Sequence, residues 1–341
     1  MQPTEALSHL VAGRDLSIEE TESLFDQLMD GALSDAMKAA LLVALEVKGA
    51  SISEITGAAK AMRSRVQRVH HSCHDVVDTC GTGGDGKGTF NISTAAALVA
   101  AAAGVPVAKH GNRSVSSRSG SADVLEELGV ELDLTPGQMA RSLETIGIAF
   151  LFAPKLHPAM AEVAPLRKEL GIRTIFNVLG PITNPAAAQR QLIGVFALDL
   201  VEKIAAVLAA LGSTHAMVVH GSDGLDEITT TGPTHVCELK MGELTSYTLD
   251  PEDFGFERVE PQDLHGGDPA KNAVLIEEVI GGQGGPLADI TALNAAAALY
   301  VGGRAEDLAD GVGLARQAIL SGAACRKLEQ LRSFSASPTA L

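Results

Sequence analysis

A glycine-rich stretch, VDTCGTGGDGKGTFNIST (77–94), has the composition and spacing of a loop that binds phosphate. Its glycines match the dinucleotide fingerprint GxGxxG at Gly81, Gly83 and Gly86. That fingerprint requires a helix to begin at its third glycine, so that the helix dipole meets the pyrophosphate. Here seven residues, KGTFNIS, separate Gly86 from the expected helix, and the next strand ends near Lys109 instead of at an acid that binds ribose. The dinucleotide interpretation therefore fails.

The same glycines also match the Walker A pattern over residues 81–87, but Gly88 stands where that pattern requires Ser or Thr to hold Mg²⁺. What remains is a longer anion-binding turn, in which glycines let several backbone N–H groups face one anion without a Cβ in the way. Asn91, Ser93 and Thr94 then begin a helix whose N-terminus favours negative charge. We expect this loop to hold a phosphate group.

A second polar loop, KHGNRSVSS (109–117), follows the next expected strand and supplies two cations and several short hydrogen-bond donors. Ser121 lies at the start of the helix that comes after it. Because the carboxyl ends of parallel strands meet at one crevice, both loops are expected to face the same ligand. They predict a ligand phosphorylated at two separated points. The alternative is a glycine-rich turn beside a solvated basic loop, with no binding function.

An acidic pair, Asp226 and Glu227, follows the expected strand HAMVVH (215–220). Adjacent carboxylates in a glycine-rich turn can be a mere solvated loop. Beside a phosphate site they would repel the ligand unless a cation intervened, and Mg²⁺ uses one or two carboxylates with phosphate oxygens and water. The pair therefore predicts a magnesium site. The cluster HHSCH (70–74) lacks a second ligand pair at any usual zinc spacing, so we expect it to be structural or incidental.

A segment that could bind an acceptor substrate, KLHPAMAEVAPLRKELGIR (155–173), carries His157, Arg167 and Arg173. Arginine is suited to bidentate capture of a carboxylate. Arg167 lies toward the apolar side of its expected helix, which favours a binding role over a solvated surface position. We expect Arg167 to bind an anionic group.

Length and composition limit the classes of protein to which the chain can belong. Its 341 residues allow two domains of roughly 150 residues each. The formal net charge of −16 disfavours a nucleic-acid partner, which needs a basic surface. Four widely spaced cysteines suit a reducing compartment. The first residues lack a signal-peptide pattern, and no apolar run reaches the ~20 residues that cross a membrane. We expect a cytoplasmic protein with no nucleic-acid or membrane partner.

The apolar patterns predict two kinds of structure. Residues 1–70 contain only amphipathic helical patterns, which indicates a small helical bundle. From residue 75, short apolar strands alternate with helical stretches, which predicts a mostly parallel sheet with helices on both faces. Residues 234–249 predict a strand pair, and two long alanine-rich helices are expected from Leu287 onward. The expected fold class is α/β, with a small N-terminal helical domain and a larger α/β domain.

A helix and a Gly/Pro/Asn-rich loop, NVLGPITNP, interrupt the alternation between Pro165 and Pro185. We therefore expect a division in which an inserted segment belongs with the N-terminal helices. The expected units are a helical domain at 1–72, completed by the inserted segment 165–188, and an α/β domain at 73–341.

Six features in order along the chain resemble the anthranilate phosphoribosyltransferase family. They are GTGGD (81–85), NIST (91–94), KHGNRSVSS (109–117), HPAM (157–160), LGIRTIFNVLGPITNP (170–185) and the Asp226–Glu227 pair. The match covers nearly the whole chain, and its departures, at Cys80 and Lys87, fall where the family varies. The resemblance implies transfer of the phosphoribosyl group from 5-phosphoribosyl-1-pyrophosphate (PRPP) to the amine of anthranilate. The products would be N-(5-phosphoribosyl)anthranilate and pyrophosphate, in L-tryptophan biosynthesis.

The resemblance also implies Mg²⁺, with two ions expected, and a homodimer formed through the helical parts. Carried over position by position, it assigns metal contacts to Ser93, Asp226 and Glu227. It assigns anthranilate contacts to Gly81, Asn112, His157 and Arg167. The PRPP contacts that it implies are Gly81, Gly84, Asp85, Thr89, Asn91, Ile92, Ser93, Thr94, Lys109, His110, Gly111, Asn112, Arg113, Ser114, Val115, Ser116, Ser117 and Ser121. No residue is a certain catalytic group, although His110 and Arg167 are expected to assist.

Two other functions stay open at this point. A pyrimidine nucleoside phosphorylase would share the fold, but the glycine loop and lysine–serine motif of those enzymes differ from GTGGDG and KHGNR. A non-catalytic relative that binds nucleic acid would need a basic surface and could lose the metal pair. The net charge of −16 and the intact Asp226–Glu227 pair argue against that relative.

Overall fold

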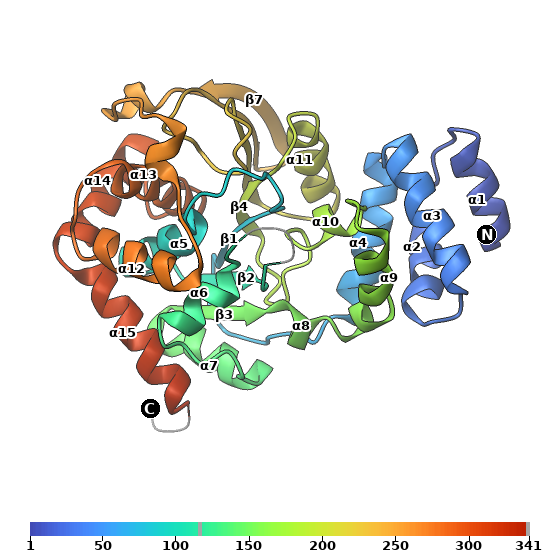
Figure 1. Cartoon of the computed structure of the whole chain (residues 1–341), viewed down its shortest axis with the longest axis horizontal. Coiled ribbons are helices and arrows are strands. Elements are labelled where there is room, and N and C mark those ends of the chain that lie inside the picture. The colour runs from blue at the N-terminus through green and yellow to red at the C-terminus, as the bar shows by residue number, and fades with distance from the viewer. Residues whose placement is uncertain (115–117, 339–341) are drawn as a thin grey trace.

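The computed structural model describes residues 1–114 and 118–338. A group of N-terminal helices lies beside a larger body in which helices surround a sheet (Figure 1). The N-terminal helices are α1 (Pro3–Val11), α2 (Ile18–Met29), α3 (Asp35–Lys48) and α4 (Ile52–Arg65). The expected helical N-terminal part is confirmed. None of the helices in the described part of the chain is long and apolar enough to cross a membrane.

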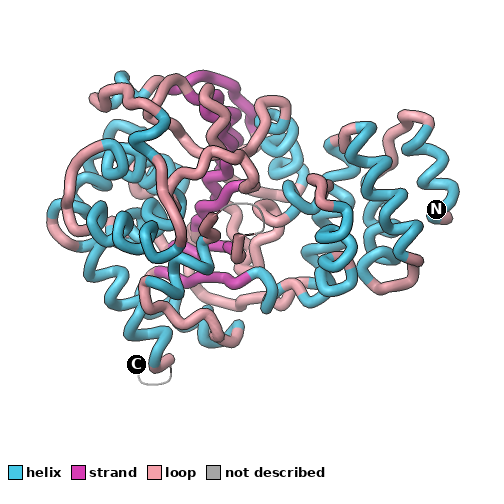
Figure 2. Tube along the Cα trace, viewed as in Figure 1, coloured by secondary structure: helices cyan, strands magenta, loops and turns pink. Residues whose placement is uncertain are grey.

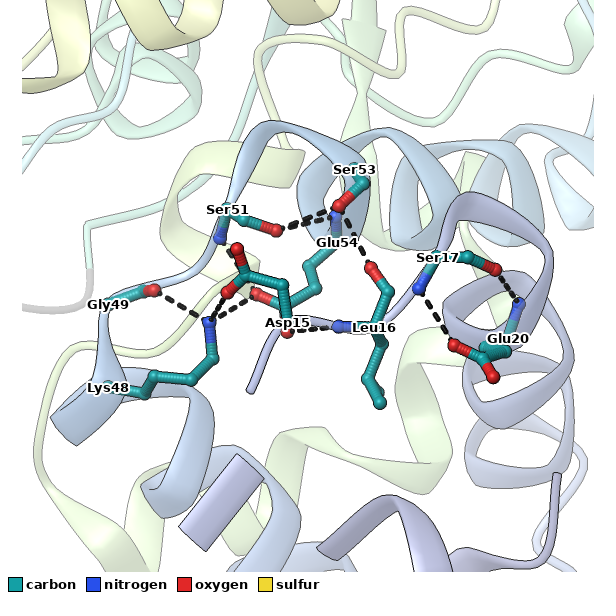
Figure 3. A network of polar contacts seen from close by, with 9 residues as sticks. All are labelled: Asp15, Leu16, Ser17, Glu20, Lys48, Gly49, Ser51, Ser53 and Glu54. Carbon is teal, nitrogen blue, oxygen red and sulfur yellow. Dashed lines mark hydrogen bonds and ion pairs between the residues drawn. The ribbon is translucent and has the colours of Figure 1, made fainter. Parts of the chain in front are cut away.

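A buried carboxylate joins three parts of this helical bundle (Figure 3). Glu54 is fully buried, and its oxygens accept hydrogen bonds from Leu16 N (3.1 Å), Ser51 N (2.8 Å) and Lys48 Nζ (2.9 Å). Ser51 Oγ in turn accepts from Glu54 N (3.3 Å), which completes a capping box at the start of α4. Because three donors, one of them a cation, bond to this carboxylate, they offset the free-energy cost of burying its charge. The network fixes α4 against the end of α3 and the chain before α2.

Seven strands form one sheet among the described residues. They are β1 (Val77–Gly81), β2 (Val107–Gly111), β3 (Ile148–Phe152), β4 (Arg190–Gly194), β5 (His215–Gly221), β6 (Thr234–Lys240) and β7 (Glu243–Leu249). Their order is β3-β2-β1-β4-β5-β6-β7, and all pairs from β3 to β5 are parallel, whereas β5–β6 and β6–β7 are antiparallel. The expected mostly parallel sheet is confirmed.

Helices cover both faces of this sheet, as the sequence predicts (Figure 2). Alternate strand residues point to opposite faces. Leu192 and Met217 therefore pack into one hydrophobic core with α5 and α13, while Ile193 and Val218 pack into another with α11 and the helical bundle. Helices of the α/β part are α5 (Ile92–Ala102), α6 (Ser121–Glu127), α7 (Pro136–Ile146), α8 (Ala153–Leu156), α11 (Leu200–Ala210), α12 (Pro269–Ile280), α13 (Pro286–Val301), α14 (Leu308–Leu320) and α15 (Ala323–Ala336). Short 3₁₀ helices span Pro158–Glu162, Pro251–Phe254 and Pro261–Leu264.

The expectation of two long helices from Leu287 onward is wrong. Three helices, α13 to α15, occupy the described part of this region, and α12, which the sequence does not predict, precedes them. Gly303 (φ 73°) and Gly322 (φ 69°) adopt the left-handed conformation that ends a helix, so the alanine-rich pattern is broken twice. Helices α12, α14 and α15 pack against α5, which contacts β1 and β2 (Figure 1).

A segment between β3 and β4 returns to the helical bundle. It contains α9 (Ala164–Leu170), which contacts α3, and α10 (Phe176–Leu179), which contacts α4. The ring centroids of Phe176 and Phe25 lie 5.7 Å apart in the shared core. Three connections therefore join the bundle to the sheet: one from α4 to β1, one from β3 into this segment, and one from this segment to β4.

Candidate active site

The glycine loop after β1 lies directly against the acidic loop after β5. Gly83 N donates a hydrogen bond of 2.7 Å to Asp226 Oδ2. Thr82 N also donates to Gly194 O (2.9 Å), so the loop continues the pairing of β1 with the end of β4. The expected meeting of these loops at the carboxyl edge of the sheet is therefore seen in the structure.

Gly81 and Gly194 leave the space that this contact requires, because neither residue carries a Cβ. A Cβ on Gly81 would lie 2.5 Å from Asp226 Oδ2, and a Cβ on Gly194 would lie only 1.5 Å from Asp226 O. Gly81 and Gly194 are paired neighbours in the β1–β4 ladder. Gly81, the first glycine of the GTGGD motif, thus lets the acidic loop approach β1. This packing role is additional to the phosphate binding that the sequence predicts for the motif.

Three carboxylates, Asp85, Asp226 and Glu227, face one another at this junction. Burial raises the pKa of Asp226 well above its usual range, and the charges of Asp85 and Glu227 raise it further. Burial also raises the pKa of Glu227 to about 7, although the Lys109 ammonium opposes the shift. Crowded carboxylates with raised pKa values favour a bound cation, because a cation would relieve their repulsion.

The donor set of this junction suits Mg²⁺. Ser93 lies within hydrogen-bonding reach of Glu227, so the structure brings together the expected contacts Ser93, Asp226 and Glu227. No three acid, histidine or cysteine side chains of the described residues could hold a metal by themselves. One hydroxyl and two carboxylates suit Mg²⁺, which is usually bound by one or two carboxylates together with ligand phosphates and water.

Lys109 is a buried cation beneath the acidic junction. Its side chain is 4% exposed, and its Nζ donates to Thr79 O and to Ser93 Oγ (3.2 Å for the latter). Burial lowers its pKa, but the negative charges of Asp78 and Glu227 act in the opposite direction. Lys109 therefore links β1, the helix start at Ser93 and the acids.

Asp78, inside β1, is a site residue that the sequence analysis missed. It is fully buried, and its oxygens accept from His110 N (3.0 Å) and Asn184 Nδ2 (2.7 Å). Burial raises its pKa to about 6. A carboxylate within the apolar strand VVDTC was the available signal, because a charge in a buried strand needs dedicated partners. Asp78 holds the end of β2 against the loop that contains Asn184.

His110 and His157 form a buried pair with defined proton positions. Their Nε2 atoms lie 3.1 Å apart, and His110 Nδ1 lies 3.1 Å from Gly180 O. A carbonyl only accepts, so His110 Nδ1 carries a proton and His110 Nε2 accepts from His157 Nε2–H. His157 Nδ1 is then a buried lone pair that has no partner among the described residues.

Both histidines are neutral at pH 7. Burial and the neighbouring His157 lower the pKa of His110 to about 3, and burial lowers that of His157 to about 4. An unfolded histidine titrates near 6.5, so below that pH the unfolded chain binds protons that the folded pair refuses. Stability should therefore fall as the pH falls from about 6.5 toward 4.

We expect His157→Gln to reduce this acid sensitivity. Between pH 7 and pH 5, the free energy of unfolding of the variant should fall by about 2 kcal/mol less than that of the original chain, because one suppressed protonation is removed. Urea unfolding at the two pH values measures the difference. His9→Gln, which removes a histidine outside the pair, is the matched control for the loss of one imidazole. Equal pH slopes for the original chain and His157→Gln would contradict the assignment.

Two arginines of the 164–173 region face the site differently. Arg167 is desolvated, which lowers its pKa, and its Nη2 donates a long hydrogen bond to Asn177 Oδ1 (3.4 Å). Its guanidinium lies 5.4 Å from the centroid of the Phe176 ring, and no described carboxylate forms an ion pair with it. Arg173, by contrast, donates to Gly84 O in the glycine loop and stacks 4.1 Å from the centroid of the Phe196 ring. Arg167 is available for an anion, whereas Arg173 joins the helical segment to the glycine loop.

Several other expected PRPP contacts are engaged within the protein. Arg113 forms an ion pair with Asp123 (3.2 Å) and contacts Glu126, so its guanidinium is directed to α6. The Ile92 side chain is buried in the core, and the Thr94 hydroxyl is buried without a partner among the described residues. Ser121 Oγ donates to Asn112 O (3.4 Å).

The remaining expected contacts lie along the two loops. Asn91 Oδ1 accepts from Ser119 Oγ (3.1 Å) and Asn272 Nδ2 (2.9 Å), and Thr89 pairs with His265 in an isolated bridge. The contribution of the 265–272 segment was missed, because nothing in its sequence marks it as a neighbour of the glycine loop. Gly111 ends β2. The expected contacts Val115, Ser116 and Ser117 lie outside the described residues.

The chain matches known proteins over almost its whole length. Residues 4–66 match the helical bundle domain of the glycosyl transferase family, and residues 73–325 match the a/b domain of that family. The anthranilate phosphoribosyltransferase of Chromobacterium violaceum is 54% identical over 334 residues, which cover 98% of each chain. The chain belongs to the anthranilate phosphoribosyltransferase family.

Other members of the family agree with this assignment. That of Clostridium kluyveri is 50% identical over 330 residues, covering 97% of this chain and 98% of its own. The crystal structure of the Thermus thermophilus member superposes with a TM-score of 0.92 at 44% identity, covering 97% and 99% of the two chains. That of the Saccharomyces cerevisiae member in complex with PRPP and Mg has a TM-score of 0.88 at 28% identity, covering 98% of each. The expected resemblance is confirmed, and these relatives give no support to the nucleoside phosphorylase or nucleic-acid-binding alternatives.

Proposed function

We propose that this chain transfers the 5-phosphoribosyl group of PRPP to the amine of anthranilate, releasing pyrophosphate, in L-tryptophan biosynthesis. The observation that carries the proposal is the docking of the Asp226–Glu227 loop on the glycine loop, beside buried Lys109. Family membership supports it. So do the yeast structures, which were solved with PRPP and Mg and with 4-fluoroanthranilate.

The proposed chemistry requires stabilisation of departing charge. Breaking the bond between C1 of the ribose and the pyrophosphate oxygen leaves positive charge on the ribose and negative charge on pyrophosphate. The N-terminus of α5 would favour that charge through its dipole. Backbone N–H groups of the glycine loop would donate to it, apart from those of Thr82, Gly83 and Lys87, which already bond within the protein. Ser93, Asp226 and Glu227 would hold Mg²⁺, for which we propose two ions. When bound, Mg²⁺ would neutralise the diphosphate.

The proposed acceptor binds on the other side of the crevice. Arg167 would take the anthranilate carboxylate, together with contacts from Gly81, Asn112 and His157. The aniline nitrogen is neutral at pH 7, so it needs no base before it attacks. Once it has attacked, the His157 Nδ1 lone pair is a fitting acceptor for its proton, because that atom is buried and has no partner among the described residues.

We expect Arg167→Ala to raise KM for anthranilate about tenfold to a hundredfold, since a hydrogen bond to a charged group is worth about 1.5–3 kcal/mol. KM for PRPP should change little. Steady-state kinetics with each substrate varied in turn measures both values. The matched control is Lys168→Ala, which removes an exposed cation from the next position of α9. An equal rise in both KM values would rule out the carboxylate contact.

Further parts of the proposal concern organisation. We propose a cytoplasmic homodimer formed through the helical parts. The proposed division is a helical domain at 1–72, completed by 165–188, and an α/β domain at 73–341. Light scattering of the purified chain tests the dimer.

The proposed activity is tested by the loss of anthranilate fluorescence on addition of PRPP, with and without Mg²⁺. We expect turnover to require both. Phosphate-dependent cleavage of a pyrimidine nucleoside in place of that turnover would favour the phosphorylase alternative instead.

A further inference from the structure

A cavity of about 600 Å³ lies between two of the three connections that join the helical bundle to the sheet. One wall is formed by residues 68–76, which lead into β1, and the other by residues 185–190, which lead into β4. The walls are joined by a hydrogen bond from Val69 N to Pro185 O (3.0 Å). We call this space the hinge cavity. It lies at the amino ends of the strands, so it is separate from the candidate active site at their carboxyl ends.

The lining of the hinge cavity is rich in cationic and imidazole groups. The three histidines of HHSCH (70–74) line it, together with Arg68 and Arg190. Arg190 is paired with Asp75 (2.8 Å), whereas no described carboxylate forms an ion pair with Arg68. An unpaired guanidinium beside several imidazoles suits a phosphate group, which it can bind through two hydrogen bonds.

One imidazole atom in this lining lacks a partner. His71 Nε2 lies 3.0 Å from Ala186 O, so Nε2 carries the proton and Nδ1 presents a lone pair. His71 Nδ1 is buried and has no hydrogen-bond partner among the described residues. The nearby carboxylate of Glu144 accepts instead from Ser72 N (2.7 Å) and Ser72 Oγ (2.8 Å). A buried acceptor of this kind is normally satisfied, and a ligand hydroxyl would satisfy it.

The same histidines do not form a metal site. Within the described ranges, no three histidine, cysteine or acid side chains are placed to bind one ion together. The sequence alone predicts that HHSCH is structural or incidental, and the cavity gives the motif a more specific interpretation. The ligand must offer an anion to Arg68 and a hydroxyl to His71, and a volume of about 600 Å³ is within the roughly 300–1,000 Å³ range of small-molecule sites.

We propose that the hinge cavity binds a small sugar phosphate, with its phosphate on Arg68 and a sugar hydroxyl donating to His71 Nδ1. Such a ligand would contact at once the connection that leads into β1 and the connection that leads into β4. The site is independent of the proposed transferase activity.

The test is a titration of the full chain with ribose 5-phosphate in Mg²⁺-free buffer, followed by the imidazole NMR signals. Single His→Gln variants assign those signals. We expect saturable shifts at His71 and its neighbours. The affinity should fall at least tenfold in Arg68→Ala and should be unchanged in Arg14→Ala, which removes an exposed arginine of the helical bundle. Inorganic phosphate should bind more weakly than ribose 5-phosphate at the same signals, and ribose alone should not bind.

The NMR results that would overturn this proposal differ from the turnover result that would overturn the transferase function. This proposal is wrong if shifts appear only at His110 and His157, if no saturable shift appears at millimolar ligand, or if Arg68→Ala and Arg14→Ala bind alike. Because Arg68 is exposed and lies outside the crevice, Arg68→Ala should remain folded, which its circular dichroism and anthranilate turnover check. The NMR result stands whether or not the transferase assay succeeds.

Discussion

Glu227→Gln is expected to lower kcat/KM for PRPP about a thousandfold, because it removes one of the charges that would hold Mg²⁺ against the departing pyrophosphate. Glutamine keeps the size of the side chain, so packing is preserved. The fluorescence assay with anthranilate measures the loss, and the apparent affinity for Mg²⁺ should fall as well. Glu243→Gln, which removes an exposed acid from β7, is the matched control and should retain full activity.

Stability should respond to Glu227→Gln in the opposite direction. The pKa of Glu227 is raised from 4.5 to about 7 in the folded chain, so stability is lost as the pH rises between these values, and a neutral glutamine does not share that loss. After partial solvent screening, we expect a gain of about 1–2 kcal/mol in the free energy of unfolding at pH 8. A variant that loses kcat/KM while its free energy of unfolding rises would show that Glu227 serves the function of the protein and not its stability. Near-normal turnover at every Mg²⁺ concentration would contradict the metal role.

Gly194→Ala is expected to lower the free energy of unfolding by about 4 kcal/mol and to abolish turnover. The new Cβ would lie 1.5 Å from Asp226 O, and neither backbone can move freely, because Gly194 is paired with both β1 and β5. The acidic loop would be displaced from the glycine loop. Urea unfolding and the fluorescence assay measure the two effects.

Gly313→Ala is the matched control for this substitution. Gly313 is exposed within α14, and a Cβ there would meet nothing within 4 Å. Alanine in a helix should stabilise the chain by about 0.5–1 kcal/mol. If Gly194→Ala proved as stable and active as Gly313→Ala, the close approach of Asp226 to β4 would be wrong.

The sequence was sufficient for the features that follow from strand order. Parallel strands bring their carboxyl ends to one edge, so the sequence alone places the glycine loop, Lys109 and the Asp226–Glu227 pair together. The alternating patterns likewise predicted both faces of the sheet. These inferences need only local periodicity and one topological rule.

Features that depend on close tertiary approach could not be predicted in this way. Nothing local to Gly194 indicates that the backbone carbonyl of Asp226, from a later loop, lies against it. The contact of Arg173 with Gly84 spans two separate parts of the chain. Arg113 was expected to bind substrate, yet acids of α6 lie within its reach. Each of these three contacts depends on packing between segments that are separate in the chain, and no local sequence pattern predicts such packing.

A crystal of the chain soaked with PRPP and Mg²⁺ gives the most direct measurement. We predict diphosphate density against the backbone of residues 81–85 and metal density on Asp226 and Glu227. The sugar bound away from both polar loops, or the two acids bare of metal and facing solvent, would contradict the proposed function.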